Sequence, residues 1–87
     1  MYCLRFLTRA VKDLKRIDRP FQKIIKEKLS ILAENPKVLK NNITALKGED
    51  DLFRLRVGNY RVIFSKEDKE LIILIIRVGH RKDIYSG

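Results

Sequence analysis

The sequence is poor in the residues that form cross-links and metal sites. It contains one cysteine, Cys3, and one histidine, His80. A single cysteine cannot form an internal disulfide, and these two residues together cannot supply the four ligands of a structural zinc site. We therefore expect no metal and no other cofactor, so that any chemistry comes from the side chains alone.

Long apolar runs are also missing. The longest covers residues 71–76, which is far short of the ~18 residues that a membrane span needs. The apolar stretch at the N-terminus is too short for a secretory signal, and neither repeats nor Gly/Ser linkers divide the 87 residues. These absences predict a single domain, residues 1–87, located in the cytoplasm without a membrane partner.

Acidic residues are scarce. The chain has 20 Lys and Arg residues against 11 Asp and Glu, a formal net charge of +9. The excess is concentrated in residues 1–47, which hold 12 basic and 4 acidic side chains, whereas residues 48–87 hold 8 and 7. This balance favours a polyanionic partner, either a nucleic acid or an acidic protein.

The first part of the chain has helical spacing after a short β-favouring segment at residues 2–7. Apolar residues then recur at intervals of three and four, which predicts two consecutive helices that form a hairpin. Thr8 is expected to cap the first helix and Asp18 the second, and Asn35-Pro36 ends the second. Residues 36–51 are polar and are expected to form a loop.

From residue 53 the spacing of the apolar residues changes to two. Apolar and basic residues alternate through residues 53–57 and 60–64, and Gly58-Asn59 between them is typical of a two-residue hairpin turn. Residues 71–78 are almost entirely apolar, as in a strand buried on both faces. The pattern therefore predicts an α+β protein in which a helical hairpin precedes a three-stranded antiparallel meander.

The hairpin register determines where its arginines lie. With a turn at Gly58-Asn59, Arg56 lies opposite Arg61, and Arg54 lies on the same face of the sheet, away from the helices. Directly opposed like charges are destabilising, so either a bound anion or a carboxylate of residues 49–51 must offset them. The face is therefore either a concave phosphate-binding surface or an ordinary solvated one.

The last strand has two registers available against this hairpin. We favour the one that keeps Arg77 out of the core. It leaves Ile73, Ile75 and Arg77 beside the other arginines and, if the chain stays extended, directs Arg81 to the same side. The residues then expected to face the helices are Ile72, Leu74, Ile76 and Val78.

Three segments carry a family resemblance: Lys47-Gly48, FRLRVGNYRVIF at 53–64 and RVGHRKDIY at 77–85. Together they resemble the RelE/ParE superfamily of bacterial and archaeal toxins, and the combination of the Tyr-Arg strand with a terminal GHRxxxY is more specific than either part. The resemblance implies a RelE-like fold, in which a short N-terminal strand completes a mostly antiparallel sheet.

The resemblance also implies a function, as the toxin of a type II toxin–antitoxin pair. RelE-like members cut messenger RNA in the ribosomal A site, whereas ParE-like members poison DNA gyrase and are not nucleases. The RelE-like function is favoured because Tyr85 follows Arg81, an arrangement used in RNA cleavage. The implied partners are a RelB-like antitoxin, the ribosome and mRNA. An inactive member that only pairs with an antitoxin is a third alternative.

Carried over to this sequence, the RelE pattern implies three catalytic residues, Arg61, Arg81 and Tyr85. The resemblance and the local charge also imply a set of RNA-contacting residues: Lys47, Arg54, Arg56, His80 and Lys82. Whether His80 or Glu49 joins the proton transfer stays open.

The expected reaction needs only these side chains. In RNA the 2′-OH can attack the neighbouring phosphorus, which produces a 2′,3′-cyclic phosphate and a 5′-OH without water or a metal ion. The protein must accept a proton, stabilise negative charge on phosphorus and protonate the leaving oxygen. Arg61 suits the second task as a permanent planar cation, whereas Tyr85 can stack on a base or accept the 2′-OH proton.

Overall fold

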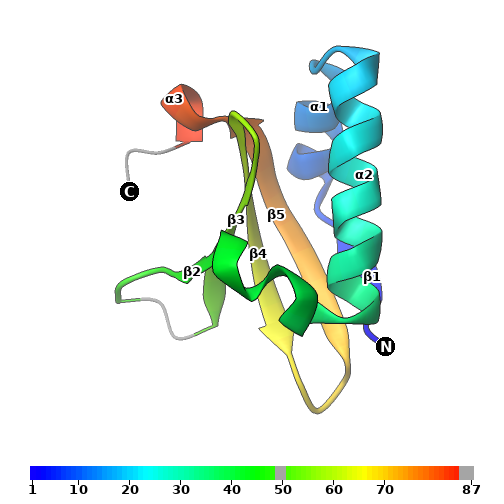
Figure 1. Ribbon diagram of the computed structural model, residues 1–87, viewed down its shortest axis with the longest axis vertical. Coiled ribbons are helices and arrows are strands. Elements are labelled where there is room, and N and C mark those ends of the chain that lie inside the picture. The colour runs from blue at the N-terminus through cyan, green and yellow to red at the C-terminus, as the bar shows by residue number, and fades with distance from the viewer. Residues whose placement is uncertain (49–50, 85–87) are drawn as a thin grey trace.

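A five-stranded sheet lies beside two helices in the computed structural model, which describes residues 1–48 and 51–84 (Figure 1). The α+β class expected from the sequence is confirmed. The elements in chain order are β1 (Cys3–Phe6), α1 (Thr8–Lys15), α2 (Arg19–Glu34), the 3-10 helix η1 (Pro36–Asn42), β2 (Ile43–Ala45), β3 (Leu52–Val57), β4 (Tyr60–Glu67), β5 (Ile72–His80) and α3 (Arg81–Ile84).

The strands are ordered β1-β5-β4-β3-β2. β1 pairs with β5 in parallel, and every other neighbouring pair is antiparallel. The N-terminal strand therefore completes a mostly antiparallel sheet, as the resemblance implied. Within the described residues, no helix combines the length and hydrophobicity that crossing a membrane requires.

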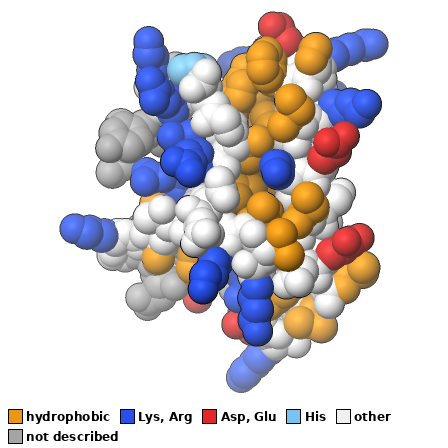
Figure 2. All heavy atoms as spheres, in the orientation of Figure 1, with side chains coloured by type: hydrophobic (Ala, Val, Ile, Leu, Met, Phe, Trp, Pro, Cys, Tyr) orange, Lys and Arg blue, Asp and Glu red, His pale blue; other side chains and the backbone are white. Residues whose placement is uncertain are grey.

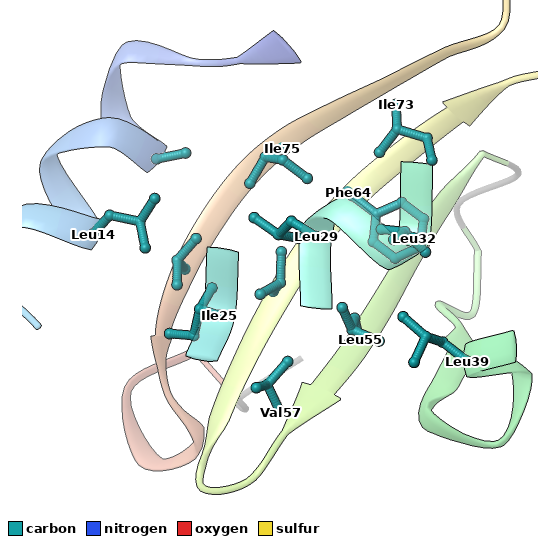
Figure 3. Close-up of a cluster of buried hydrophobic side chains, with 13 residues drawn as sticks. Leu14, Ile25, Leu29, Leu32, Leu39, Leu55, Val57, Phe64, Ile73 and Ile75 are labelled. Atoms are coloured by element: carbon teal, nitrogen blue, oxygen red, sulfur yellow. The ribbon is translucent and has the colours of Figure 1, made fainter. Parts of the chain in front are cut away.

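The hydrophobic core lies between α2 and one face of the sheet, and α1 adds Ala10 and Leu14 at its edge. Figure 3 shows the apolar side chains of α2 directed towards those of β3, β4 and β5. Complete burial of an aliphatic or aromatic side chain contributes about 1.5–3 kcal/mol. The largest fully buried side chains are Phe64, Ile25, Leu29, Leu32, Leu55, Ile73, Ile75, Val62 and Val78.

The β3–β4 hairpin has the expected register. Arg56 lies opposite Arg61, and Leu55 lies opposite Val62. Gly58 has φ of +58°, in the left-handed region that a primed two-residue turn requires and that glycine adopts without strain. Leu55 and Val62 are completely buried, so this face of the hairpin packs on the helices and the arginine face is directed away from them.

The expectation of a loop over residues 36–51 is wrong for residues 36–45. Residues Pro36–Asn42 form η1, and Ile43–Ala45 form β2, which pairs with β3. Leu39 of η1 is only 6% exposed and belongs to the core. A three-residue strand has too little alternation to be recognised from sequence, because pairing with β3 rather than local spacing holds it in place.

The expected helix caps are only partly correct. α2 ends at Glu34, with Asn35 as its C-cap, as expected from Asn35-Pro36. α1 begins at Thr8 itself, with Leu7 in the N-cap position, so Thr8 does not cap this helix. Asp18 occupies the N-cap position of α2, but its side chain makes no capping hydrogen bond.

The favoured register of the last strand is wrong over most of its length. Ile63 pairs with Arg77, whereas Phe64 pairs with Ile75, so the register shifts by one residue at this point. Val78 faces the helices as expected, but beyond the shift Ile73 and Ile75 are the completely buried residues. A β-bulge adds one residue to one strand and reverses which side chains face the core.

Tyr2 connects the N-terminus to the end of β4. Its hydroxyl donates a hydrogen bond to Asp68 Oδ1 at 2.6 Å, and Lys66 Nζ lies 3.0 Å from the same oxygen. The hydrogen bond to Asp68 raises the pKa of Tyr2, and accepting it lowers the pKa of Asp68. Near neutral pH Tyr2 is therefore protonated and Asp68 is ionised, and each residue stabilises this state of the other.

The stabilising effect of this hydrogen bond should depend on pH. Asp68 has a lowered pKa, so its contribution is complete above the unfolded value of 3.8 and is lost as pH falls through the folded value. Tyr2 has a raised pKa, so its contribution is complete below 10.0 and is lost as pH rises through the folded value. The free energies of unfolding of the wild type and Tyr2→Phe, measured with denaturant, should differ between these two pH limits and become equal outside them. A constant difference at all pH values would contradict this coupling.

Candidate nucleic-acid interface

A polar hollow of about 180 Å³ lies on the face of the sheet away from the helices. In Figure 2 Lys and Arg side chains lie at the left of the view, away from α2, as well as on α2 and along the lower part of the molecule. The hollow combines three cations with three neutral polar side chains, a composition suited to a polyanion. Its lining residues are Asn41, Asn42, Thr44, Arg54, Arg56 and Arg61.

Arg61 is held in position by the hairpin turn beside it. Its Nη1 donates hydrogen bonds to the carbonyl oxygens of Gly58 at 3.1 Å and Tyr60 at 2.9 Å. Arg61 and Arg54 are partly buried, whereas Arg56 is exposed. A guanidinium held over a rigid turn is already oriented when an anion arrives, so little reorganisation is needed to stabilise a charged ligand.

Three of the six residues that line the hollow were not predicted as site residues from the sequence. β2 places Thr44 opposite Arg54 on the same face of the sheet. Asn42 Nδ2 donates a 3.5 Å hydrogen bond to the carbonyl oxygen of Arg56. The one available signal was the short alternation Ile43-Thr44-Ala45, which places Thr44 on the face opposite its two apolar neighbours.

Arg81 lies at the same end of the sheet as Arg61. Gly79 pairs with Arg61, and the backbone N–H of Arg81 donates to the carbonyl oxygen of Asn59 in the hairpin turn at 2.8 Å. The expectation that the chain stays extended here is wrong, because α3 begins at Arg81. The Arg81 side chain is exposed. Tyr85 lies outside the described residues, as does Glu49.

His80 lies on the other face of the sheet. It pairs with Tyr60, and the two rings meet edge to face with centroids 5.8 Å apart. Tyr60 packs against the core, so the sheet separates the His80 ring from Arg61. His80 Nδ1 accepts a 3.2 Å hydrogen bond from the backbone N–H of Lys82. Lys82 and Lys47 are exposed, and neither lines the hollow.

Arg77 does not join the arginine cluster, contrary to expectation. Its Nε lies 3.5 Å from Asp13 Oδ2 of α1, and the backbone N–H of Val78 donates to the same oxygen at 3.0 Å. The Asp13 side chain is only 12% exposed. Asp13 thus satisfies both a guanidinium and a backbone donor of β5, and fastens α1 to that strand.

Removal of the Asp13 carboxylate should destabilise the fold. Asp13→Ala leaves the Val78 N–H and the Arg77 guanidinium without this acceptor, which should lower the free energy of unfolding by about 1–3 kcal/mol. Asp13→Asn retains an amide oxygen that can accept from Val78 and should cost less. Urea denaturation checks both variants, and equal stability of Asp13→Ala and the wild type would contradict this role.

Comparison with known proteins identifies the family. A family model described as "ParE toxin of type II toxin-antitoxin system, parDE" matches residues 4–85. The chain belongs to the RelE/ParE superfamily of toxins. It is 29% identical to mRNA interferase toxin RelE of Escherichia coli, over 98% of this chain and 90% of that protein. It is 33% identical to Toxin RelG of Mycobacterium tuberculosis, over 97% of this chain and 95% of that protein.

A solved structure of the superfamily shares the architecture. The RelE-RelB complex of the archaeon Pyrococcus horikoshii matches with a TM-score of 0.79 and 29% identity, covering 92% of this chain and 94% of that one. The family model has a ParE description, whereas these relatives are named RelE or RelG. Since RelE/ParE members share the fold, the chemistry of the site has to distinguish a nuclease from a protein-binding toxin.

Proposed function

We propose that residues 1–87 form a single toxin domain of a type II toxin–antitoxin pair that acts as an mRNA interferase, an endoribonuclease that cuts mRNA in the ribosomal A site. The observation that carries this proposal is the convergence of Arg54, Arg56 and Arg61 on one hollow of the open sheet face. The named activity of the E. coli relative supports it.

The hollow can bind the scissile phosphate and stabilise its transition state. When the 2′-oxygen attacks phosphorus and the P–O5′ bond breaks, negative charge grows on the non-bridging phosphate oxygens. Arg61 stabilises this charge through paired N–H donors, and Arg54 and Arg56 bind the flanking phosphates. Arg81, at the same end of the sheet, clamps the phosphate or donates a hydrogen bond to the leaving 5′-oxygen, which takes its proton from water.

Proton transfer is assigned to Tyr85. A tyrosine has an unperturbed pKa of about 10, and neighbouring arginines would favour the phenolate that accepts the 2′-OH proton. His80 is less suited to this role because its ring contacts Tyr60 on the opposite face of the sheet. The alternative for Tyr85 is stacking on a base, which Tyr85→Phe would preserve.

Primer extension on mRNA with purified protein, with and without ribosomes, tests this proposal. We expect cuts within translated codons only when ribosomes are present. The fragments should carry 2′,3′-cyclic phosphate ends. A parallel gyrase supercoiling assay tests the ParE-like alternative that the family description raises. Inhibition of gyrase without RNA cleavage would replace the proposed function with that alternative.

We further propose that a RelB-like antitoxin binds this protein through an acidic amphipathic segment. The support is a groove of about 330 Å³ beside η1, whose lining contains no carboxylate. The rings of Phe53 and Phe64 stack there with centroids 5.5 Å apart. Apolar side chains with surrounding lysines suit an amphipathic acidic partner. The accessible side chains that the argument uses lie over the buried Leu32 and Phe64, and they are Pro36, Ile43, Phe53, Lys37, Lys40 and Lys66.

Charge reversal in the groove should weaken antitoxin binding. Lys37→Glu with Lys40→Glu is expected to lower the affinity for the product of the neighbouring gene at least tenfold, because both lysines line the groove. Lys23→Glu with Lys26→Glu, on exposed positions of α2, changes the net charge equally and should have a smaller effect. Calorimetry measures both variants, and equal losses would indicate that only net charge matters.

A further inference from the structure

One wall of the arginine hollow is neutral. Asn41 and Asn42 at the end of η1, together with Thr44 of β2, line the hollow beside the three arginines. Lys40 and Lys47, which flank this segment in sequence, do not line it. The segment therefore brings amides and a hydroxyl to the hollow, whereas the two lysines that flank it in sequence lie outside the hollow.

The neutral side chains are positioned by the sheet. Thr44 lies opposite Arg54 in the β2–β3 pairing, so both side chains share the open face. Asn42 is partly buried, and its Nδ2 donates to the carbonyl oxygen of Arg56. This bond uses one amide hydrogen, which leaves Asn42 with a second donor and an acceptor oxygen.

The chemistry of this wall differs from that of a phosphate site. Phosphate oxygens only accept hydrogen bonds, so an amide carbonyl oxygen gains nothing from them. The edge of a nucleobase carries donors and acceptors side by side, which an asparagine amide can match with two hydrogen bonds. Single-stranded RNA exposes these edges, and proteins read its sequence there.

We propose that Asn41, Asn42 and Thr44 read the edge of one nucleobase beside the phosphate held by the arginines, and so make cleavage selective for sequence. This inference rests on the proposed function, because the arginines define which phosphate the base adjoins. The arginines supply affinity common to all sequences, and the neutral wall supplies discrimination.

Mapping of cleavage sites in ribosome-bound mRNA tests the inference. Asn42→Ala and Thr44→Val should lower the preference for one base at a single position about five- to a hundredfold, while cuts at disfavoured sequences keep their rate. Asn35→Ala, an exposed asparagine at the end of α2, is the matched control and should leave the site distribution unchanged. Thermal unfolding confirms that each variant is folded.

Two outcomes would overturn the base-reading role while the proposed function survives. One is slower cutting of every site by the same factor, which indicates contacts to sugar or phosphate. The other is an unchanged distribution of cleavage sites in both variants.

If the wild type cuts no mRNA, the proposed function fails, and oligonucleotide binding then tests the inference separately. The wild type should bind four 2′-O-methyl homo-oligonucleotides unequally, and equal affinities would overturn it.

Discussion

Arg61→Ala is expected to slow ribosome-dependent cleavage of mRNA about 100- to 1,000-fold, equivalent to roughly 3–4 kcal/mol of transition-state stabilisation. The reason is geometric as well as electrostatic. The carbonyl oxygens of Gly58 and Tyr60 hold Nη1 of Arg61 at 3.1 and 2.9 Å, so the guanidinium is oriented before the phosphate binds. Single-turnover primer extension at saturating ribosome concentration measures the loss.

Two further variants separate geometry from net charge. Arg61→Lys keeps the charge but loses the planar pair of donors, so its rate should lie between those of the wild type and Arg61→Ala. Arg9→Ala removes one charge from an exposed position on α1 and should leave the rate nearly unchanged. Equal losses in Arg9→Ala and Arg61→Ala would show that Arg61 acts only through overall charge, and a near-normal rate in Arg61→Ala would remove it from the site.

Ile75→Ala is expected to lower the free energy of unfolding by about 2–5 kcal/mol. Ile75 is completely buried and pairs with Phe64 across β4 and β5, in the centre of the core (Figure 3). Truncation leaves a cavity that the packed neighbours fill only in part. At ~4–8 °C per kcal/mol for a domain of this size, the loss should be clear in thermal unfolding, and urea denaturation gives its free energy.

The neighbouring residue provides the control for this prediction. Leu74 is the same size but only partly buried, so Leu74→Ala should cost less than half as much as Ile75→Ala. The comparison tests the register shift between Ile63 and Phe64. An uninterrupted register from Val78 would place Leu74 in the core, and a larger loss in Leu74→Ala would indicate that arrangement.

The arginine face of the hairpin could be predicted because its causes are local. Alternation over residues 53–64 and the turn at Gly58-Asn59 define the register of two adjoining strands, and that register places Arg54, Arg56 and Arg61 together. The structure confirms this pairing residue by residue. Cross-strand neighbours in a tight hairpin are separated by few residues, so few competing arrangements exist.

The rest of the site depends on contacts between distant segments. Thr44 reaches the hollow only because β2 pairs with β3, and His80 lies beside Tyr60 because β5 pairs with β4. Arg77 turns to Asp13, which is 64 residues away in the chain. The spacing of residues in the sequence does not predict these pairings, because each is stabilised by packing or by hydrogen bonds that form only in the assembled sheet.

The amino-acid sequence by itself determined the α+β class, the two consecutive helices and the arginine-bearing hairpin, because helical and strand periodicity and turn chemistry act over a few residues. The motifs at residues 53–64 and 77–85 carried the resemblance to the superfamily. The tertiary structure alone decided the short strand β2, the bulge that moves Ile73 and Ile75 into the core, and the pairing of Arg77 with Asp13 of α1. The physical reason is that one residue of register reverses every side chain beyond it, and the packing of the whole core selects that register.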